Sequence, residues 1–559
     1  MATNIEGRTL RRNTTFVDLV EGANDSVVHV ETEDYQICCS FFSNLFNVGS
    51  LATAVFFILS TLYIAYIFVY SDLTKEELTV MSFLYSIIVL FVLNRIQLYK
   101  RFIFKYIEIF LDIFQENIYR DILNSIITAG ILSFVTYLCS QNLKRVYALC
   151  SMTALLLISF IINIKHVADI RWNVVLRSLN LQFIMATLLF YFPYGRECII
   201  YIGRGIVEYL KFSEVGATFV YGNMLMNEFV FAFYILSAIY LSLMTIAILR
   251  HIGFLDYIIG FSEKLSFLIG ISSIEGVFGI VNIFLSMTET CVVVRNSLDK
   301  LSKSELFSLM VTGLSTISFT ALFGYVSLGA NVDYLLISSI ISIPCSFAFS
   351  KIYVPVTNEV ASVQETCPLQ QFDSTLHDSN NNNDGNEERG KNILDKCVDA
   401  IVEANFIVQM IIGNVIAIMS FVAFVDKFIE LLLRPFVVDM GILKCLSFAV
   451  AYIIPVLGVD PLDAKIIAEM FVKKILVNEF VAFEILGKNV DTFTSERSIA
   501  IANFLVCGFG NISAAGMLTS IICSITNFKV NSSSLMVKSL IIACIVNIYC
   551  ACTISILID

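Results

Sequence analysis

The sequence contains a series of apolar stretches, most of them long enough to cross a lipid bilayer. A helix needs about 20 predominantly apolar residues to span the hydrocarbon core. Because 57% of the 559 residues are hydrophobic and only 15% are charged, the composition excludes an ordinary soluble domain. We therefore predict an all-α polytopic membrane protein with about eleven transmembrane helices. The expected spans are residues 46–70, 78–94, 122–139, 146–164, 174–192, 229–249, 306–329, 334–350, 404–425, 498–528 and 539–558.

Two further apolar regions, 265–294 and 446–483, do not fit a simple span, because acids, Pro or Gly interrupt them. Each is followed by a span rich in Gly, Ser and Thr, at 306–329 and 498–528. The second of these spans exceeds one crossing, and we expect it to bend at its glycines. Paired interrupted segments are typical of transporters with repeated halves and a binding site at their interface. Irregular backbone at membrane depth must line a cavity or be wrapped in protein.

The interrupted regions carry carboxylates that hydrocarbon cannot solvate, so Glu289 and Glu479 must face a cavity, a partner or the protein interior. An ionised carboxylate can hold two hydroxyls by charge-assisted hydrogen bonds, which suits the vicinal hydroxyls of a ribose. Asn511 can donate and accept, and Phe509 offers a flat face for a ring. The alternative is that such acids form structural ion pairs. Glu275 in particular could pair with Arg250 or Lys264.

Neutral oxygen atoms in the same regions suggest a monovalent cation site. Asn282 and Thr316 offer side-chain oxygens, and unwound backbone carbonyls beside them would complete a sodium site. The alternative for Asn282 is a hydrogen bond between helices. No His/Cys cluster suggests a transition metal. The sequence also has no basic patch typical of a nucleic-acid binder and no nucleophile–base pattern typical of an enzyme.

Loop charges predict the orientation. The loops after the second and fourth expected spans are basic and the first loop is acidic, which favours a cytosolic N-terminus, since basic loops stay in the cytosol. We expect a multi-pass protein of the plasma membrane, surrounded by lipid. Residues 1–45 are expected to form a cytosolic tail, and the Asn-rich residues 357–391 to form a flexible polar loop.

Three longer motifs carry a resemblance to a known family. Asn282–Glu289, Asn478–Phe483 and Cys507–Ser513 resemble NIFxGQTE, NEFVAY and CGFANxS of the concentrative nucleoside transporters. The order and spacing of the motifs make the resemblance specific from about Trp172 to the C-terminus. Shorter matches lie at Leu181–Phe183, Phe192–Gly195, Phe219–Gly222, Ser304–Leu306 and Ser350–Lys351.

The resemblance implies a homotrimer with scaffold and transport domains that works by an elevator movement. Two re-entrant helical hairpins and two broken helices would build the site. Residues 46–145 would be three extra N-terminal helices, 146–356 the core with the first hairpin, and 392–559 the core with the second. The implied nucleoside contacts are Ser286, Met287, Thr288, Glu289, Ala321, Glu479, Phe509, Asn511 and Ala514. The implied sodium ligands are Asn282 and Thr316, with the carbonyls of Leu285 and Ile317.

The chain departs from the family motif at three of these contacts. Ser286-Met287 stands where the family has Gly-Gln, and that Gln normally hydrogen-bonds the base. Ala514 replaces a Ser. Sugar recognition is therefore better supported by the sequence than base recognition, and the preferred base stays open.

The predicted function is sodium-coupled import of nucleosides. The alternatives are proton coupling through Glu289, and a nucleoside-sensing or channel-like protein on the same scaffold.

Overall fold

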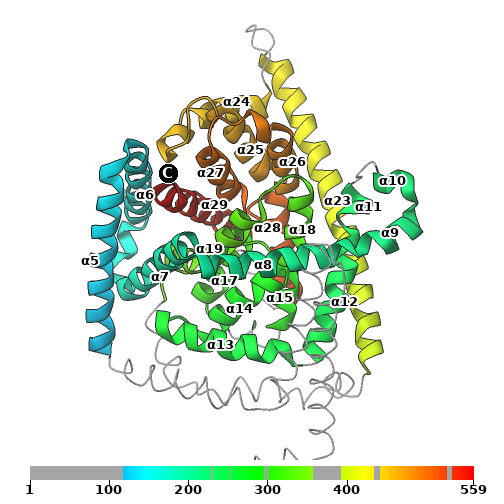
Figure 1. Ribbon diagram of the computed structural model, residues 1–559, viewed down its shortest axis with the longest axis horizontal. Coiled ribbons are helices and arrows are strands. Elements are labelled where there is room, and N and C mark those ends of the chain that lie inside the picture. The colour runs from blue at the N-terminus through cyan, green and yellow to red at the C-terminus, as the bar shows by residue number, and fades with distance from the viewer. Residues whose placement is uncertain are drawn as a thin grey trace, which may run out of the picture. The chain divides into compact units, whose positions relative to one another are not determined.

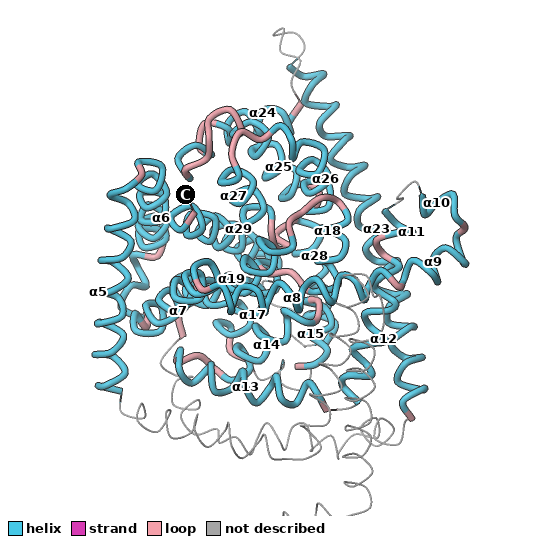
Figure 2. Tube along the Cα trace, in the orientation of Figure 1, coloured by secondary structure: helices cyan, strands magenta, loops and turns pink. Residues whose placement is uncertain are grey.

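Every regular element that the structure describes is a helix (Figure 2). The computed structural model describes residues 117–227, 231–251, 253–294, 298, 301–356, 392–433, 441–525 and 532–558. The predicted tail at 1–45, the first two expected spans and the Asn-rich loop at 357–391 lie outside the described residues. All described residues belong to one compact unit, Ile109–Asp559.

The described helices form two similar series of elements, and a group of ten elements comes before the first series (Figure 1). The first elements are α5 (Asn117–Gln141), α6 (Leu143–Ile162), η1 (Ile164–Asp169), α7 (Trp172–Tyr191), α8 (Pro193–Lys211), α9 (Ser213–Tyr221), α10 (Asn223–Asn227), α11 (Phe231–Tyr234), α12 (Ser237–His251) and α13 (Phe254–Ile269). The first series is α14 (Ser273–Phe284), α15 (Met287–Val293), α17 (Lys303–Ser315), α18 (Phe319–Ser327) and α19 (Val332–Tyr353). Then follow α23 (Ile393–Leu433), α24 (Ile442–Ala451) and η4 (Ile454–Leu457). The second series is α25 (Ala464–Leu476), α26 (Glu479–Asn489), η5 (Val490–Thr492), α27 (Glu496–Val506), α28 (Ile512–Ile525) and α29 (Ser532–Leu557).

Seven helical segments of the described residues are long and apolar enough to cross a membrane. Each overlaps one of the expected spans, and Ile393–Leu432 extends beyond the expected 404–425 at both ends. These segments are Asp121–Gln141, Leu143–Ile162, Trp172–Tyr191, Ala232–His251, Val332–Tyr353, Ile393–Leu432 and Ser534–Leu557.

The two remaining expected spans in the described chain are each broken into two short helices. The expected span over 306–329 is interrupted beside Thr316, where unwound backbone was expected, because α17 ends at Ser315 and α18 begins at Phe319. Ser318 explains the restart, since its hydroxyl accepts a hydrogen bond from Ala321 N and so caps α18. The expected bend in 498–528 is confirmed as a break between α27 and α28.

The two series repeat one order: a helix pair joined at a tight turn, two half-helices around a break, and a long helix. The helix pairs are α14–α15 and α25–α26, the half-helices are α17–α18 and α27–α28, and the long helices are α19 and α29. The long helices contact each other, and both are largely buried among the other elements. The order agrees with the repeated halves that the paired interrupted segments predict.

The breaks pack directly against each other. Gly508 has a φ of 97°, and a Cβ added there would lie 2.6 Å from the carbonyl oxygen of Ser315. Asn547 of α29 joins the two breaks, because its Nδ2 donates to Ser315 O at 3.1 Å and to Cys507 O at 2.6 Å. Backbone carbonyls freed by the breaks therefore find partners inside the apolar core.

A buried ion pair ties the first series together at one end. Lys351 of α19 contacts Glu275 of α14 at 2.5 Å and Ser304 Oγ at 3.2 Å. The structural role suggested for Glu275 is confirmed, but the partner predicted from the sequence, Arg250 or Lys264, was wrong. The pairing joins residues 76 positions apart, which sequence proximity could not indicate.

Replacing Gly508 by Ala should lower the melting temperature of the purified protein. A side chain at this positive φ costs about 1–2 kcal/mol, and the new Cβ would collide with the Ser315 carbonyl. The matched control is Gly516→Ala in α28, where an added Cβ meets no atom within 4 Å. Thermal unfolding that is equally affected in both variants would contradict the tight contact between the breaks.

Candidate functional site

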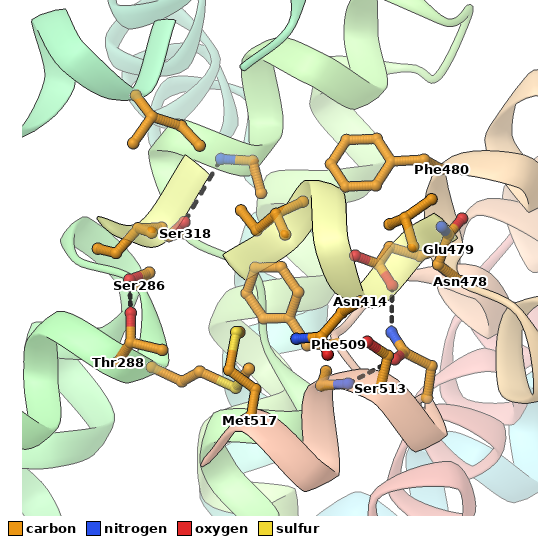
Figure 3. A pocket seen from close by; sticks show the side chains of 18 of the residues that line it. Ser286, Thr288, Ser318, Asn414, Asn478, Glu479, Phe480, Phe509, Ser513 and Met517 are labelled. Carbon is orange, nitrogen blue, oxygen red and sulfur yellow. Dashed lines mark hydrogen bonds between the residues drawn. The ribbon is translucent and has the colours of Figure 1, made fainter. Parts of the chain in front are cut away.

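A pocket lies where the turns of both helix pairs meet the two breaks (Figure 3). The turns come at Leu285–Ser286 and Val477–Asn478. Helices α12 and α23 add an apolar wall that includes Ile239 and Ile407. All nine residues expected to contact a nucleoside line this one pocket, although they are spread over residues 286–514: Ser286, Met287, Thr288, Glu289, Ala321, Glu479, Phe509, Asn511 and Ala514.

The first turn holds Glu289 by a reciprocal cap at the start of α15. Ser286 Oγ accepts from Glu289 N at 3.4 Å, and Glu289 Oε2 accepts from Ser286 N at 3.2 Å. The Ser286 hydroxyl also lies 2.8 Å from that of Thr288. This Ser-x-x-Glu arrangement is a capping box, so one carboxylate oxygen is engaged locally. Both Thr288 and Glu289 are buried in the pocket wall.

The second turn holds Glu479 by side chains from two other elements. Asn478 caps α26 by accepting from Val481 N at 2.9 Å. Tyr325 of α18 donates to Glu479 Oε1 at 3.0 Å, and Asn511, in the break of the second series, donates to Oε2 by a short hydrogen bond. Because three elements fix this carboxylate, its position is set before any ligand arrives.

An aromatic ring lies between the two polar ends of the pocket. Figure 3 shows Phe509 with Ser286 and Thr288 on one side and with Glu479 and Asn478 on the other. The arrangement can stack a flat ring while hydroxyl groups reach the carboxylates.

Sequence reasoning missed part of the polar lining. Ser318, Asn414, Asn478 and Ser513 also line the pocket. Asn414 had a usable signal, because a polar side chain inside an apolar helix is uncommon. Only packing of α23 against the pocket reveals which face of that helix matters.

The four expected sodium residues lie at the turn and break of the first series. Asn282 is fully buried on α14 and donates to Thr316 Oγ1 by a short hydrogen bond, while its own Oδ1 has no partner among the described residues. Leu285, three residues after Asn282, directly follows the end of α14, and Ile317 follows Thr316 in the break. The carbonyl of Ile317 accepts from Ser339 Oγ at 3.0 Å.

The unpartnered Asn282 oxygen fits a cation ligand. Leaving a buried acceptor unsatisfied costs about 1–3 kcal/mol. A hard monovalent cation would satisfy it, since the neighbouring groups are neutral oxygens. The helix–helix hydrogen bond that the sequence left open for Asn282 is also present, made by Nδ2 rather than Oδ1.

Comparison with known proteins identifies the family. The C-terminal model of the Na+ dependent nucleoside transporters matches residues 334–555, and their N-terminal model matches residues 150–224. The chain belongs to the concentrative nucleoside transporter family. The prediction from the motifs is therefore confirmed, and so is the prediction that the chain is not an enzyme.

The curated relatives are longer than the chain. Solute carrier family 28 member 3 of Eptatretus stoutii is 26% identical over 448 residues, covering 76% of this chain and 63% of the relative. Sodium/nucleoside cotransporter 1 of Homo sapiens is 27% identical over 418 residues, covering 70% of this chain and 61% of the relative. The chain thus spans about half to two thirds of the length of the relatives it matches.

Solved structures confirm the fold class. CNTnw in an inward-facing substrate-bound state has a TM-score of 0.65 at 23% identity, covering 74% of this chain and 97% of that one. A double variant of CNTnw in an outward-facing state has a TM-score of 0.65 at 22% identity, covering 74% of this chain and 98% of that one. These likenesses support an all-α fold.

Replacing Tyr325 by Phe should destabilise the protein by about 1.5–3 kcal/mol, the range for a hydrogen bond to a charged group. Tyr325 is fully buried, so water cannot replace its hydroxyl beside Glu479. Tyr334→Phe is the matched control, since its hydroxyl donates at 3.2 Å to the exposed Glu496, which water can solvate. Equal losses of melting temperature in the two variants would contradict a role for Tyr325 in fixing Glu479.

Proposed function

We propose that the chain imports nucleosides by symport with sodium. The observation that carries this proposal is the meeting of Glu289 and Glu479, from the turns of two different series, around Phe509 in one pocket. A nucleoside combines vicinal hydroxyls with a flat base, and these are the groups that carboxylates and an aromatic face bind. The relatives named sodium/nucleoside cotransporters support the same substrate class.

Sodium coupling is supported by the position of Asn282. Asn282, whose Oδ1 has no partner among the described residues, lies four residues before Ser286. Ser286 caps α15, the helix that carries Thr288 and Glu289. An ion bound by Asn282, Thr316 and the carbonyls of Leu285 and Ile317 would order the first turn and favour nucleoside binding. By reciprocal linkage, bound nucleoside would then favour the ion. Some of the relatives are named sodium/nucleoside cotransporters, and none of the printed names supports proton coupling.

Alternating access by an elevator movement is our proposal for the transport step. Helices α12 and α23 pack against each other, joined by a 2.8 Å hydrogen bond from Tyr240 to Asn405, and would form part of the scaffold. The helix pairs and broken helices would form the transport domain, with the pairs as re-entrant hairpins. We extend the proposal to a homotrimer in the plasma membrane with a cytosolic N-terminus, following the loop charges and the family.

Uridine uptake in sodium should exceed uptake in choline at the same pH, and Glu479→Gln should abolish it. Loss of two charge-assisted hydrogen bonds costs about 3 kcal/mol or more, which corresponds to roughly a 100-fold loss. The control is Glu496→Gln, whose carboxylate is exposed and does not line the pocket. The measurement is initial uptake per folded protein in proteoliposomes, with accumulation against a gradient as the test that excludes a channel or receptor.

Uptake that does not depend on sodium would overturn the coupling, and uptake by Glu479→Gln at the wild-type rate would remove this carboxylate from the site.

Met287→Gln should change base preference. Met287 is almost fully buried in the pocket wall, and its thioether cannot donate a hydrogen bond to a base. The measurement is competition of unlabelled nucleosides against labelled uridine. We expect altered relative affinities with sodium dependence retained. An unchanged order across purine and pyrimidine nucleosides would contradict a base contact at this position.

A further inference from the structure

Lys474 is a buried ammonium that the transport proposal leaves unexplained. It lies on α25, it is fully buried, and no carboxylate of the described residues forms an ion pair with it. Burying an unpaired charge costs several kcal/mol unless hydrogen bonds replace its hydration. The ammonium donates instead to three neutral oxygens: Leu505 O at 3.1 Å, Cys507 O at 2.9 Å and Asn547 Oδ1 at 3.3 Å.

The surroundings of Lys474 have the chemistry of a cation site. All three acceptors are neutral oxygens, and two are the carbonyls at the end of α27, where the helix is broken. Carbonyls at the end of a helix carry partial negative charge and attract cations. Unwound carbonyls in broken helices are the groups that bind coupling ions in transporters.

The position of Lys474 in the second series is that of Asn282 in the first. Asn282 lies four residues before Ser286, which caps α15, and Lys474 lies four residues before Asn478, which caps α26. Each of the two side chains reaches the break of its own series at the residue that directly follows the first half-helix. Asn282 donates to the Thr316 hydroxyl, and Lys474 donates to the Cys507 carbonyl.

We propose that the Lys474 ammonium is a tethered cation, which fills in the second series the place that an exchangeable sodium ion takes in the first. The reference to sodium in the first series rests on the proposed function. The assignment of a cation site around Lys474 rests on its own three ligands. The ammonium of Lys474 then always holds the second turn, which carries Glu479. The first turn, which carries Glu289, becomes ordered only when an ion binds.

The inference predicts that a small neutral side chain at position 474 opens a new sodium site. Lys474→Ala leaves the oxygens of Leu505, Cys507 and Asn547 around an empty space that a monovalent cation can enter. Lys474→Met is the matched control, since it removes the charge but fills the space. The measurement is the melting temperature of purified protein in sodium chloride and in choline chloride at equal ionic strength.

We expect both variants to melt lower than wild type in choline, with sodium restoring only Lys474→Ala. The sodium-dependent rise should therefore be larger in Lys474→Ala than in wild type, and no larger than wild type in Lys474→Met. Asn282→Ala should lose the wild-type rise, while the double variant Asn282→Ala/Lys474→Ala should regain one.

Equal sodium responses in Lys474→Ala and Lys474→Met would overturn the inference, and so would failure of Lys474→Ala to fold in either salt. A sodium-dependent rise of the melting temperature in the double variant, without any in wild type, would support the tethered cation at Lys474. The same result would overturn sodium coupling in the first series. The two proposals therefore fail separately.

Discussion

The structure depends on the hydrogen bonds that satisfy two broken helices inside an apolar core. Each break frees backbone carbonyls that lipid cannot solvate. Asn547 donates to carbonyls of both breaks, and Lys474 donates to the end of α27. These contacts let irregular backbone persist at the centre of the protein. The pocket follows from this arrangement, because Phe509 and Asn511 lie in one break and Ser318 lies in the other.

The two turns that face the pocket are held in different ways. The first is closed by a local cap between Ser286 and Glu289, next to a buried acceptor on Asn282 that lacks a partner. The second is held by Tyr325 and Asn511, which fix Glu479 from other elements. An ion can therefore change the order of the first turn more than that of the second. In the proposed function, this asymmetry is the physical basis for coupling a cation gradient to ligand binding.

The sequence predicted elements well where hydropathy alone decides them. Seven long apolar stretches form long helices, as expected. The carboxylates of Glu289 and Glu479 line one pocket, which the sequence also predicted. The unwound backbone beside Thr316 was expected from the sequence, and the structure adds the cap at Ser318 that restarts the helix after the break. The ion pair between Glu275 and Lys351 and the pocket-facing side of Asn414 depend on packing between distant helices. Periodicity along one helix does not contain that information.

The most direct test of the account is an experimental structure of the full protein with sodium and uridine bound. The account predicts the ribose hydroxyls beside Glu289 and Glu479, the base against Phe509, and an ion touching the free oxygen of Asn282. A nucleoside bound outside this pocket, or one whose sugar contacts neither carboxylate, would contradict it.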